Sequence, residues 1–115
     1  MSLEHVLDTL VNYGLRRTDA RVYVYLAMQG SHRARDLSHA INLRKHQLYF
    51  CLKCLRNRGF VTASHERPAL FSAVPLEEAL NLLLKTKMDE AQRTQRDMDV
   101  AISEWQSINQ GESES

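Results

Sequence analysis

The chain has 115 residues, of which 43% are hydrophobic and 25% are charged, a composition typical of a globular protein with one domain and one core. Its two cysteines cannot build the disulfide framework of a small secreted domain, and its longest apolar runs fall far short of the roughly 20 residues that a membrane span requires. Because acidic residues stand near its start, where a signal peptide needs basic ones, we expect a cytoplasmic protein with no membrane partner.

The net charge is only +1, but the charges are unevenly placed along the chain. Residues 1–67 hold 11 Lys or Arg against five Asp or Glu, a net charge of +6, whereas residues 68–115 hold four against nine, a net charge of −5. A split of this size indicates that the first part of the chain meets an anion and that the second part has another role.

Two helices are predicted in the first 30 residues. Apolar residues recur at helical spacing from Leu3 to Val11, and Gly14 then favours the end of that helix. Thr18 stands where an N-cap residue is expected, so the second helix should begin there and end at Gly30.

The next segment has the pattern of two helices joined by a tight turn. A short third helix is expected over residues 35–40, and Asn42, the residue type after glycine that best tolerates positive φ, is expected to make the turn. The fourth helix should begin near Lys45 and end at Gly59.

A β-hairpin and a long helix are predicted to follow. Residues 60–64 and 69–74 have strand character and flank a short polar loop. From residue 75 to residue 110 neither Pro nor Gly interrupts the helical pattern beyond its first turn, and residues 111–115 form a polar segment expected to be a disordered tail.

The order of these elements is typical of a winged helix-turn-helix domain. We therefore predict a mainly α-helical fold with a small β-hairpin: a DNA-binding domain over residues 1–74, followed by a long dimerisation helix over residues 75–110. In this geometry the fourth helix, about residues 45–58, enters the major groove of double-stranded DNA, and the wing, residues 60–74, lies at the minor groove.

The fourth helix has one apolar side and one basic, aromatic side. Leu48, Leu52 and Leu55 mark the buried side, so the opposite side is available to DNA. Lysine reaches guanine or phosphate, Gln47 is suited to pair with adenine, and an aromatic ring packs on a thymine methyl group. The residues predicted to contact DNA are Arg33, Arg35, Arg44, Lys45, His46, Gln47, Tyr49, Phe50, Lys53 and Arg67.

The arginines outside the fourth helix and the aromatic residue Phe50 have separate expected roles. Arg67 at the tip of the wing is placed to enter a narrow minor groove, and Arg16 and Arg17, ahead of the second helix, are placed to touch the DNA backbone. Phe50 is unusual on an exposed helix face, and packing against the wing or against another protein is an alternative to a base contact.

The motif Cys-Leu-Lys-Cys raises the possibility of a metal or redox site. Cys51 and Cys54 have the spacing of half a zinc site, but no second pair of ligands exists in the sequence, and both lie in mid-helix, where backbone N–H groups are not free to lower a thiol pKa. Packing is the favoured interpretation, with a redox role left open. No metal or cofactor is expected, and no catalytic constellation is found, so the chain is not expected to be an enzyme.

A heptad pattern runs along the long helix and predicts a homodimer. Every seventh residue from Leu84, and the residue four positions after each of the first three, is on one seam of the helix. The predicted dimerisation residues are Leu84, Met88, Ala91, Gln95, Met98, Ile102 and Trp105.

The run from Tyr13 to Val61, with "FSAVPLEEAL" after the wing, resembles the N-terminal winged helix-turn-helix domain of the TrmB-like transcriptional regulators of archaea. The motif positions that carry this resemblance are Gly14, Leu15, Asp19, Ala20, Tyr23, Leu37, Lys45, Leu48, Tyr49, Phe71, Ala73 and Pro75. The positions that depart from the family pattern are Ala34, Asn42, Phe50 and Cys54. Larger members add a sugar-binding domain after the coiled segment, where this chain stops, so sensing of a ligand by that route is not implied.

Together these observations predict a sequence-specific, double-stranded DNA-binding transcriptional regulator that acts as a homodimer. Two alternatives remain: a winged-helix module for protein–protein interaction, and a chromatin-coating protein that binds DNA without sequence preference.

Overall fold

The structure, a computed structural model, describes residues 2–114, with side chains described for residues 2–111. The chain divides into two compact units, Met1–Leu84 and Lys85–Ser115. The first unit contains four helices, the sheet and the first turns of α5 (Leu76–Glu114), and the second contains the remainder of that helix. The mainly helical winged helix-turn-helix fold with a long C-terminal helix is thus confirmed.

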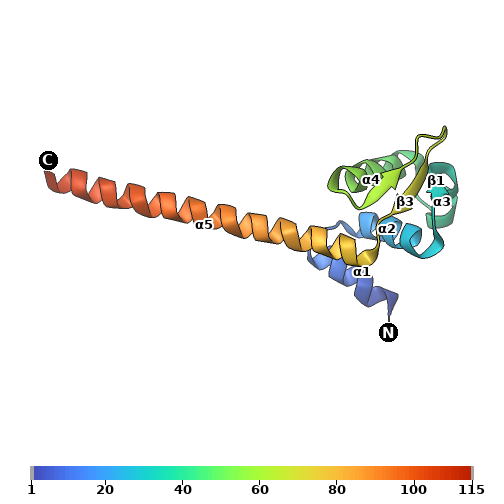
Figure 1. Cartoon of the computed structure of the whole chain (residues 1–115), viewed down its shortest axis with the longest axis horizontal. Coiled ribbons are helices and arrows are strands. Elements are labelled where there is room, and N and C mark those ends of the chain that lie inside the picture. The colour runs from blue at the N-terminus through green and yellow to red at the C-terminus, as the bar shows by residue number, and fades with distance from the viewer. Residues whose placement is uncertain (1, 115) are drawn as a thin grey trace. The chain divides into compact units, whose positions relative to one another are not determined.

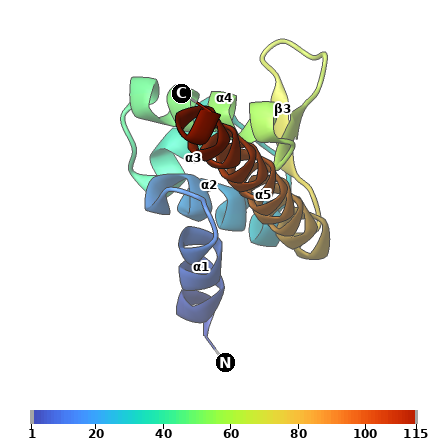
Figure 2. The ribbon, with the colours of Figure 1, turned by 90° about the vertical axis from the view of Figure 1, so that its left-hand side faces the viewer.

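The helices of the first unit are α1 (Leu3–Asn12), α2 (Arg17–Gln29), α3 (Ala34–Ile41) and α4 (Lys45–Arg58). Ser2 caps α1, since its side chain accepts a hydrogen bond from the backbone N–H of His5 at 3.2 Å. Figures 1 and 2 both show α1 on one side of this unit and α4, with the loop of the wing, on the other.

The predicted start of α2 is wrong, because Thr18 lies within the first turn of the helix and is not its N-cap. Arg16 is the N-cap residue, and its carbonyl accepts the hydrogen bond of the Ala20 N–H at 2.9 Å. An ion pair between Arg16 and Asp19 spans this first turn and stabilises the earlier start.

The wing belongs to a three-stranded antiparallel sheet, not to a two-stranded hairpin alone. The strands are β1 (His32–Arg33), β2 (Val61–Ala63) and β3 (Leu70–Ala73), in the order β1-β3-β2. The two predicted strands are confirmed at slightly shorter bounds, and β1, which pairs His32 with Phe71, is the strand that the sequence did not indicate.

The core of the first unit ties the helices to the sheet. Tyr23 of α2 is fully buried, packs edge-to-face on Phe60 with ring centroids 6.2 Å apart, and donates a hydrogen bond from its hydroxyl to the carbonyl of Val74 at 2.6 Å. Ala79 and Leu83, in the first turns of α5, are buried in the same core. The beginning of α5 is therefore an integral part of the first unit.

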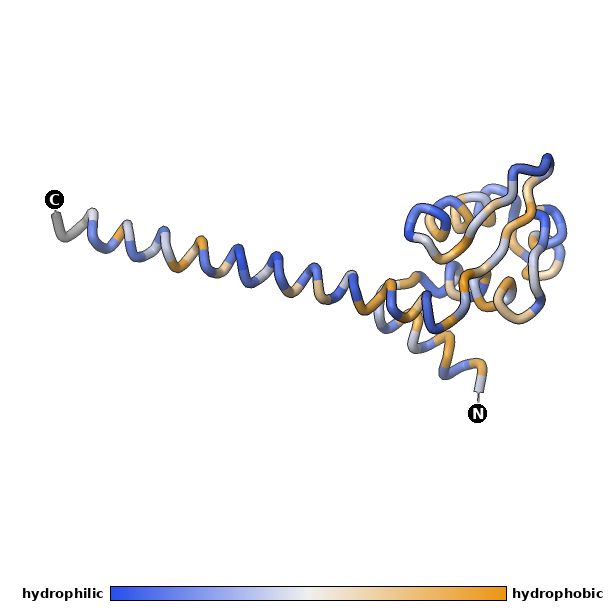
Figure 3. Tube along the Cα trace, viewed as in Figure 1, coloured by the Kyte–Doolittle hydropathy of each residue, from blue (hydrophilic) through white to orange (hydrophobic). Residues whose placement is uncertain are grey.

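The second unit is a single helical segment. Every side chain described between residues 85 and 111 is exposed, and Figure 3 shows apolar positions recurring along it. The helix continues through Glu114, so residues 111–114 of the expected tail are helical, and Ser115 lies outside the described residues. None of the helices described is long and apolar enough to cross a membrane.

Candidate nucleic-acid interface

The turn between α3 and α4 is held by a local set of hydrogen bonds. Asn42 adopts the left-handed conformation, with φ 59° and ψ 48°, as its residue type predicted. Its backbone N–H donates to the carbonyl of Ser38, and the Ser38 hydroxyl donates to the carbonyl of Leu43 at 2.7 Å. These contacts fix the direction in which α4 leaves the turn.

The two sides of α4 are divided as the sequence predicted. Leu48, Cys51, Leu52 and Leu55 are buried against the other helices and the sheet. The predicted DNA-contacting residues of this segment are all exposed: Arg44, Lys45, His46, Gln47, Tyr49, Phe50 and Lys53.

Asn57 is a further candidate on the same exposed side and is not among the residues predicted to contact DNA. It lies one helical turn after Lys53 and is exposed. Its amide donates and accepts hydrogen bonds, and the helical periodicity that places Lys53 outward identifies it too.

Gln47 has a structural role in α4. Its side-chain oxygen accepts a hydrogen bond from the backbone N–H of Arg44 at 3.3 Å, across the first turn. This is half of a capping box, in which the residue at the third helical position satisfies the N-cap N–H. The amide oxygen is therefore engaged in a hydrogen bond at the start of the helix.

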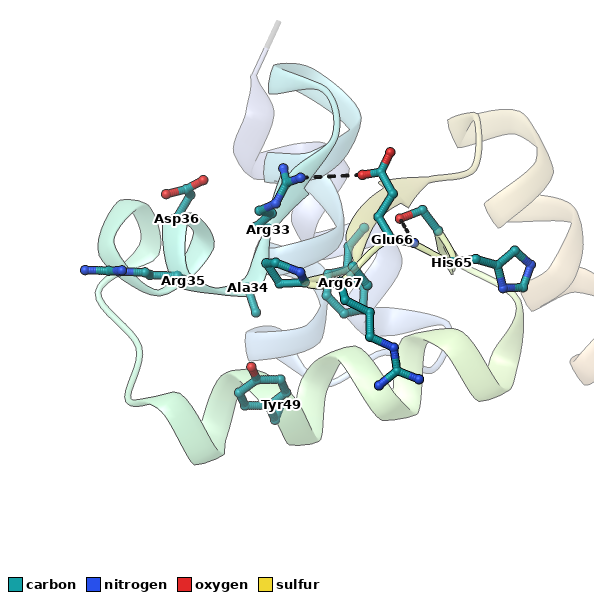
Figure 4. A pocket seen from close by; sticks show the side chains of 12 residues that line it. Arg33, Ala34, Arg35, Asp36, Tyr49, His65, Glu66 and Arg67 are labelled. Carbon is teal, nitrogen blue, oxygen red and sulfur yellow. Dashed lines mark hydrogen bonds and ion pairs between the residues drawn. The ribbon is translucent and has the colours of Figure 1, made fainter.

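A groove of about 720 Å³ lies between α4, the start of α3 and the wing, and Figure 4 shows its lining. Arg33 from β1 approaches Glu66 of the wing loop at 3.5 Å, whereas Arg35 extends away from that pair. Arg67 extends from the wing toward α4, on which Tyr49 lies. The groove thus brings together predicted interface residues from the start of α3, from α4 and from the wing.

The charges around this groove are not all free. The Glu66 carboxylate partly neutralises Arg33, so Arg33 is less suited to a phosphate contact than Arg35 or Arg67, for which the described residues supply no ion pair. The ammonium group of Lys45 lies 6.0 Å from the centroid of the Tyr49 ring, which places both side chains on the flank of α4 that faces α3.

Phe50 lies on the other flank of α4 and contacts Arg16, the N-cap residue of α2. The guanidinium carbon of Arg16 lies over the Phe50 ring at 4.6 Å from its centroid. Arg16 also donates two hydrogen bonds to the carboxylate of Asp19, at 2.9 and 2.8 Å, and these hydrogen bonds raise the pKa of Arg16 above its ordinary value. The ring contact described for Phe50 is therefore with the residue that begins α2.

The two cysteines differ in environment. Burial raises the pKa of the Cys51 thiol to about 12, with a smaller contribution from Asp19, so the thiol is protonated at neutral pH. Cys54 is half-buried and free. Among the described residues no group of three His, Cys, Asp or Glu side chains is placed to hold a metal ion.

Comparison with known proteins identifies the family. The model of the family described as "Sugar-specific transcriptional regulator TrmB" matches residues 10–77, more than half of the chain. The chain belongs to the TrmB family. This confirms the resemblance found in the sequence and, because the family consists of transcriptional regulators, the expectation that the chain is not an enzyme.

The proteins to which this TrmB-family chain is similar include regulators and, in fold, a chromatin protein. It is 25% identical over 93 residues to the HTH-type sugar sensing transcriptional regulator TrmBL1 of Pyrococcus furiosus. The matched region covers 81% of this chain and 27% of that protein. It superimposes on TrmBL2, an archaeal chromatin protein, with a TM-score of 0.84 at 18% identity over 94% of this chain and 42% of that one. A possible transcriptional regulator from Methanosarcina mazei superimposes with a TM-score of 0.61 at 15% identity. This match covers 86% of this chain and 88% of that one. The chain therefore spans about a quarter of the length of its curated relative.

The predicted dimerisation residues of this TrmB-family chain all lie on the exposed surface of α5. Met98 is 59% exposed and Trp105 is 63% exposed, and Leu84, Met88, Ala91, Gln95 and Ile102 are exposed as well. Their heptad spacing places them on one side of the helix. Val100 and Ile108 are also exposed and apolar but lie off this seam.

Proposed function

We propose that this chain binds double-stranded DNA as a homodimeric transcriptional regulator, with α4 in the major groove and the wing at the minor groove. The observation that carries the proposal is the division of α4: its leucines are buried, and the opposite side presents Lys45, His46 and Lys53 to solvent. Family membership supports the same function.

Charge favours DNA as the partner of this side of the domain. Residues 1–67 carry a net charge of +6, and one of the cations counted there, Arg67 of the wing, extends toward α4. Lys and Arg that neutralise phosphates release counterions, so binding of this kind weakens steeply as salt rises.

The salt dependence of DNA binding tests the proposal. We expect the wild-type chain to bind duplex DNA in fluorescence anisotropy, with log Kd rising linearly with log salt concentration, and Lys53→Ala to reduce that slope by about one unit. Lys87→Ala is the matched control, because Lys87 is exposed on α5 and pairs with Glu90 at 3.6 Å, so the slope should not change. Binding that does not respond to salt, or no binding at low salt, contradicts the proposal.

Dimerisation is proposed to occur through the exposed seam of α5. An apolar stripe along an isolated helix is stabilised when a second helix covers it. A dimer of this class meets two successive major grooves about 34 Å apart, so its binding site should be an inverted repeat.

A second candidate function is coating of DNA without sequence preference. Two observations favour it: the amide oxygen of Gln47 is engaged in capping α4, and the fold closely matches that of an archaeal chromatin protein. Selection of bound sites from random duplex DNA with the purified protein separates the two functions. An enriched inverted repeat supports a specific regulator, and no enrichment despite salt-dependent binding supports the coating function.

A further inference from the structure

The side chain of Arg16 is held in place from two directions. Its Nε and Nη2 atoms donate to Asp19, and its guanidinium plane lies over the ring of Phe50. Asp19 is buried, with a side chain only 4% exposed, whereas the Arg16 side chain is 52% exposed. One end of this contact is thus anchored in the core and the other faces solvent.

The remaining nitrogen of the guanidinium is available to a ligand. The Nη1 atom of Arg16 makes no hydrogen bond to the residues that the structure describes. A guanidinium that is already oriented loses little conformational freedom when it binds, and its planar array of N–H donors suits the oxygens of a phosphate.

The position of Arg16 relates this donor to the proposed DNA interface. Phe50 is on the exposed side of α4, one residue from Tyr49 and three from Lys53, and is itself 54% exposed. A cation within about 6 Å of an aromatic centroid is attracted to the ring, so Phe50 supplies a platform that holds Arg16 beside α4.

Arg17 provides the contrast. It is the next residue along the chain and carries the same charge, but its guanidinium donates to Asp8 of α1 at 2.9 Å, and both side chains are exposed. No contact described for Arg17 links it to α4.

We propose that Arg16 binds a phosphate of the DNA backbone at the flank of α4 and that Phe50 acts as the platform for Arg16 and not as a base contact. The inference rests on the proposed binding of DNA. It assigns the unusual exposed aromatic residue to the DNA interface and removes the reason to regard it as part of a protein-binding patch.

A double-mutant cycle tests the inference, with Kd for a labelled duplex measured by fluorescence anisotropy. Arg16→Gln should weaken binding by about tenfold, because the charged hydrogen bond to the phosphate is lost. Phe50→Leu should weaken binding by about fivefold, because that hydrogen bond is loosened. The double variant should bind no more than about twofold more weakly than Arg16→Gln, since the two residues act as one unit. Arg93→Gln, a change at an exposed arginine of α5 outside the predicted DNA-contacting set, is the matched control and should bind within about twofold of the wild type.

Folding is controlled separately, because Arg16→Gln leaves the buried Asp19 without its partner. Arg16→Lys keeps a cation for Asp19 but lacks the planar array of donors, and should still weaken binding at least about threefold. Circular dichroism with thermal unfolding reports whether each variant is folded.

The possible outcomes are distinct. Additive losses in the double variant, or wild-type affinity in Arg16→Lys and Arg16→Gln, overturn the inference while leaving the proposed function intact. Failure of the wild-type chain to bind duplex DNA at low salt overturns the proposed function, and the inference with it.

Discussion

The side-chain oxygen of Gln47 accepts a hydrogen bond from the backbone N–H of Arg44, at 3.3 Å. Gln47 therefore stabilises the start of the helix that is proposed to enter the major groove. We expect Gln47→Ala to lower the free energy of unfolding by about 0.5–1 kcal/mol, as the loss of other caps does, without changing the DNA sequence that is selected. Urea unfolding and site selection measure the two effects.

Gln47→Glu is the matched variant for this prediction. A carboxylate also accepts the Arg44 N–H and is favoured at a helix N-terminus, so stability should be kept. DNA affinity should fall, because the new negative charge lies near phosphates. If Gln47→Ala selects a different DNA sequence, the main role of Gln47 is base recognition and not capping of α4.

The left-handed conformation of Asn42, in the turn between α3 and α4, can be tested by substitution. Its φ of 59° is unfavourable for a residue with a Cβ, so Asn42→Ala should destabilise the protein by about 1 kcal/mol, and Asn42→Gly should be tolerated. Asn57→Ala is the control, because Asn57 is exposed and within α4, where alanine is the better helix former. Equal urea midpoints for Asn42→Ala and the wild type would show that the turn is not strained.

The parts of the fold that were predicted correctly depend on local sequence. The buried side of α4 follows from the spacing of its leucines, and the turn at Asn42 follows from the tolerance of that residue type for positive φ. β1 was not predicted because it has only two residues, and it exists through its pairing with β3, about forty residues later in the chain.

In the candidate site, too, local sequence predicted the local features and missed a contact between distant segments. Helical periodicity predicted which residues of α4 are exposed, but the contact between Arg16 and Phe50 joins residues that are far apart in sequence and required the packing of α2 on α4. The capping contact of Gln47 was concealed because Arg44, and not Ser or Thr, occupies the N-cap position.

The cysteines should differ in reactivity. The Cys51 thiol is buried and its pKa is raised to about 12, so it is protonated at pH 8, whereas Cys54 is half-buried. We expect brief treatment of the native protein with iodoacetamide to modify Cys54 alone, and treatment in urea to modify both. Mass spectrometry of the peptides identifies the sites, and equal labelling of Cys51 in the native protein contradicts the burial that the structure shows.

Stability should fall at high pH because two buried acids keep their protons in the folded state. Burial raises the pKa of Tyr23 from 10.0 to about 12 and that of Cys51 from 9.0 to about 12. The folded chain therefore binds more protons than the unfolded chain between pH 9 and 12, so this stabilisation is complete below pH 9 and is lost as the pH rises. The slope should be at most about 1.4 kcal/mol per pH unit for each group.

Tyr23→Phe separates the contribution of the tyrosine. It removes the hydrogen bond to Val74, which should cost about 1 kcal/mol at pH 8, and it should flatten the decline above pH 10. Urea unfolding at several pH values measures both effects, and an unchanged slope in Tyr23→Phe assigns the decline to other groups.

The seam on α5 can be tested by a matched pair of substitutions. Ile102 is on the predicted seam and is 54% exposed, whereas Val100 is 55% exposed and lies off the seam. A lysine at position 102 would have to be buried between two helices, so Ile102→Lys should weaken the dimer at least about tenfold, whereas Val100→Lys should leave it intact. Sedimentation equilibrium measures the dissociation constant, and circular dichroism checks that both variants remain helical. Because the seam is proposed as the surface that pairs two copies, equal effects of the two lysines would show that the helices do not pair along it. A wild-type chain that is monomeric at micromolar concentration would show that the exposed stripe is not a self-association surface.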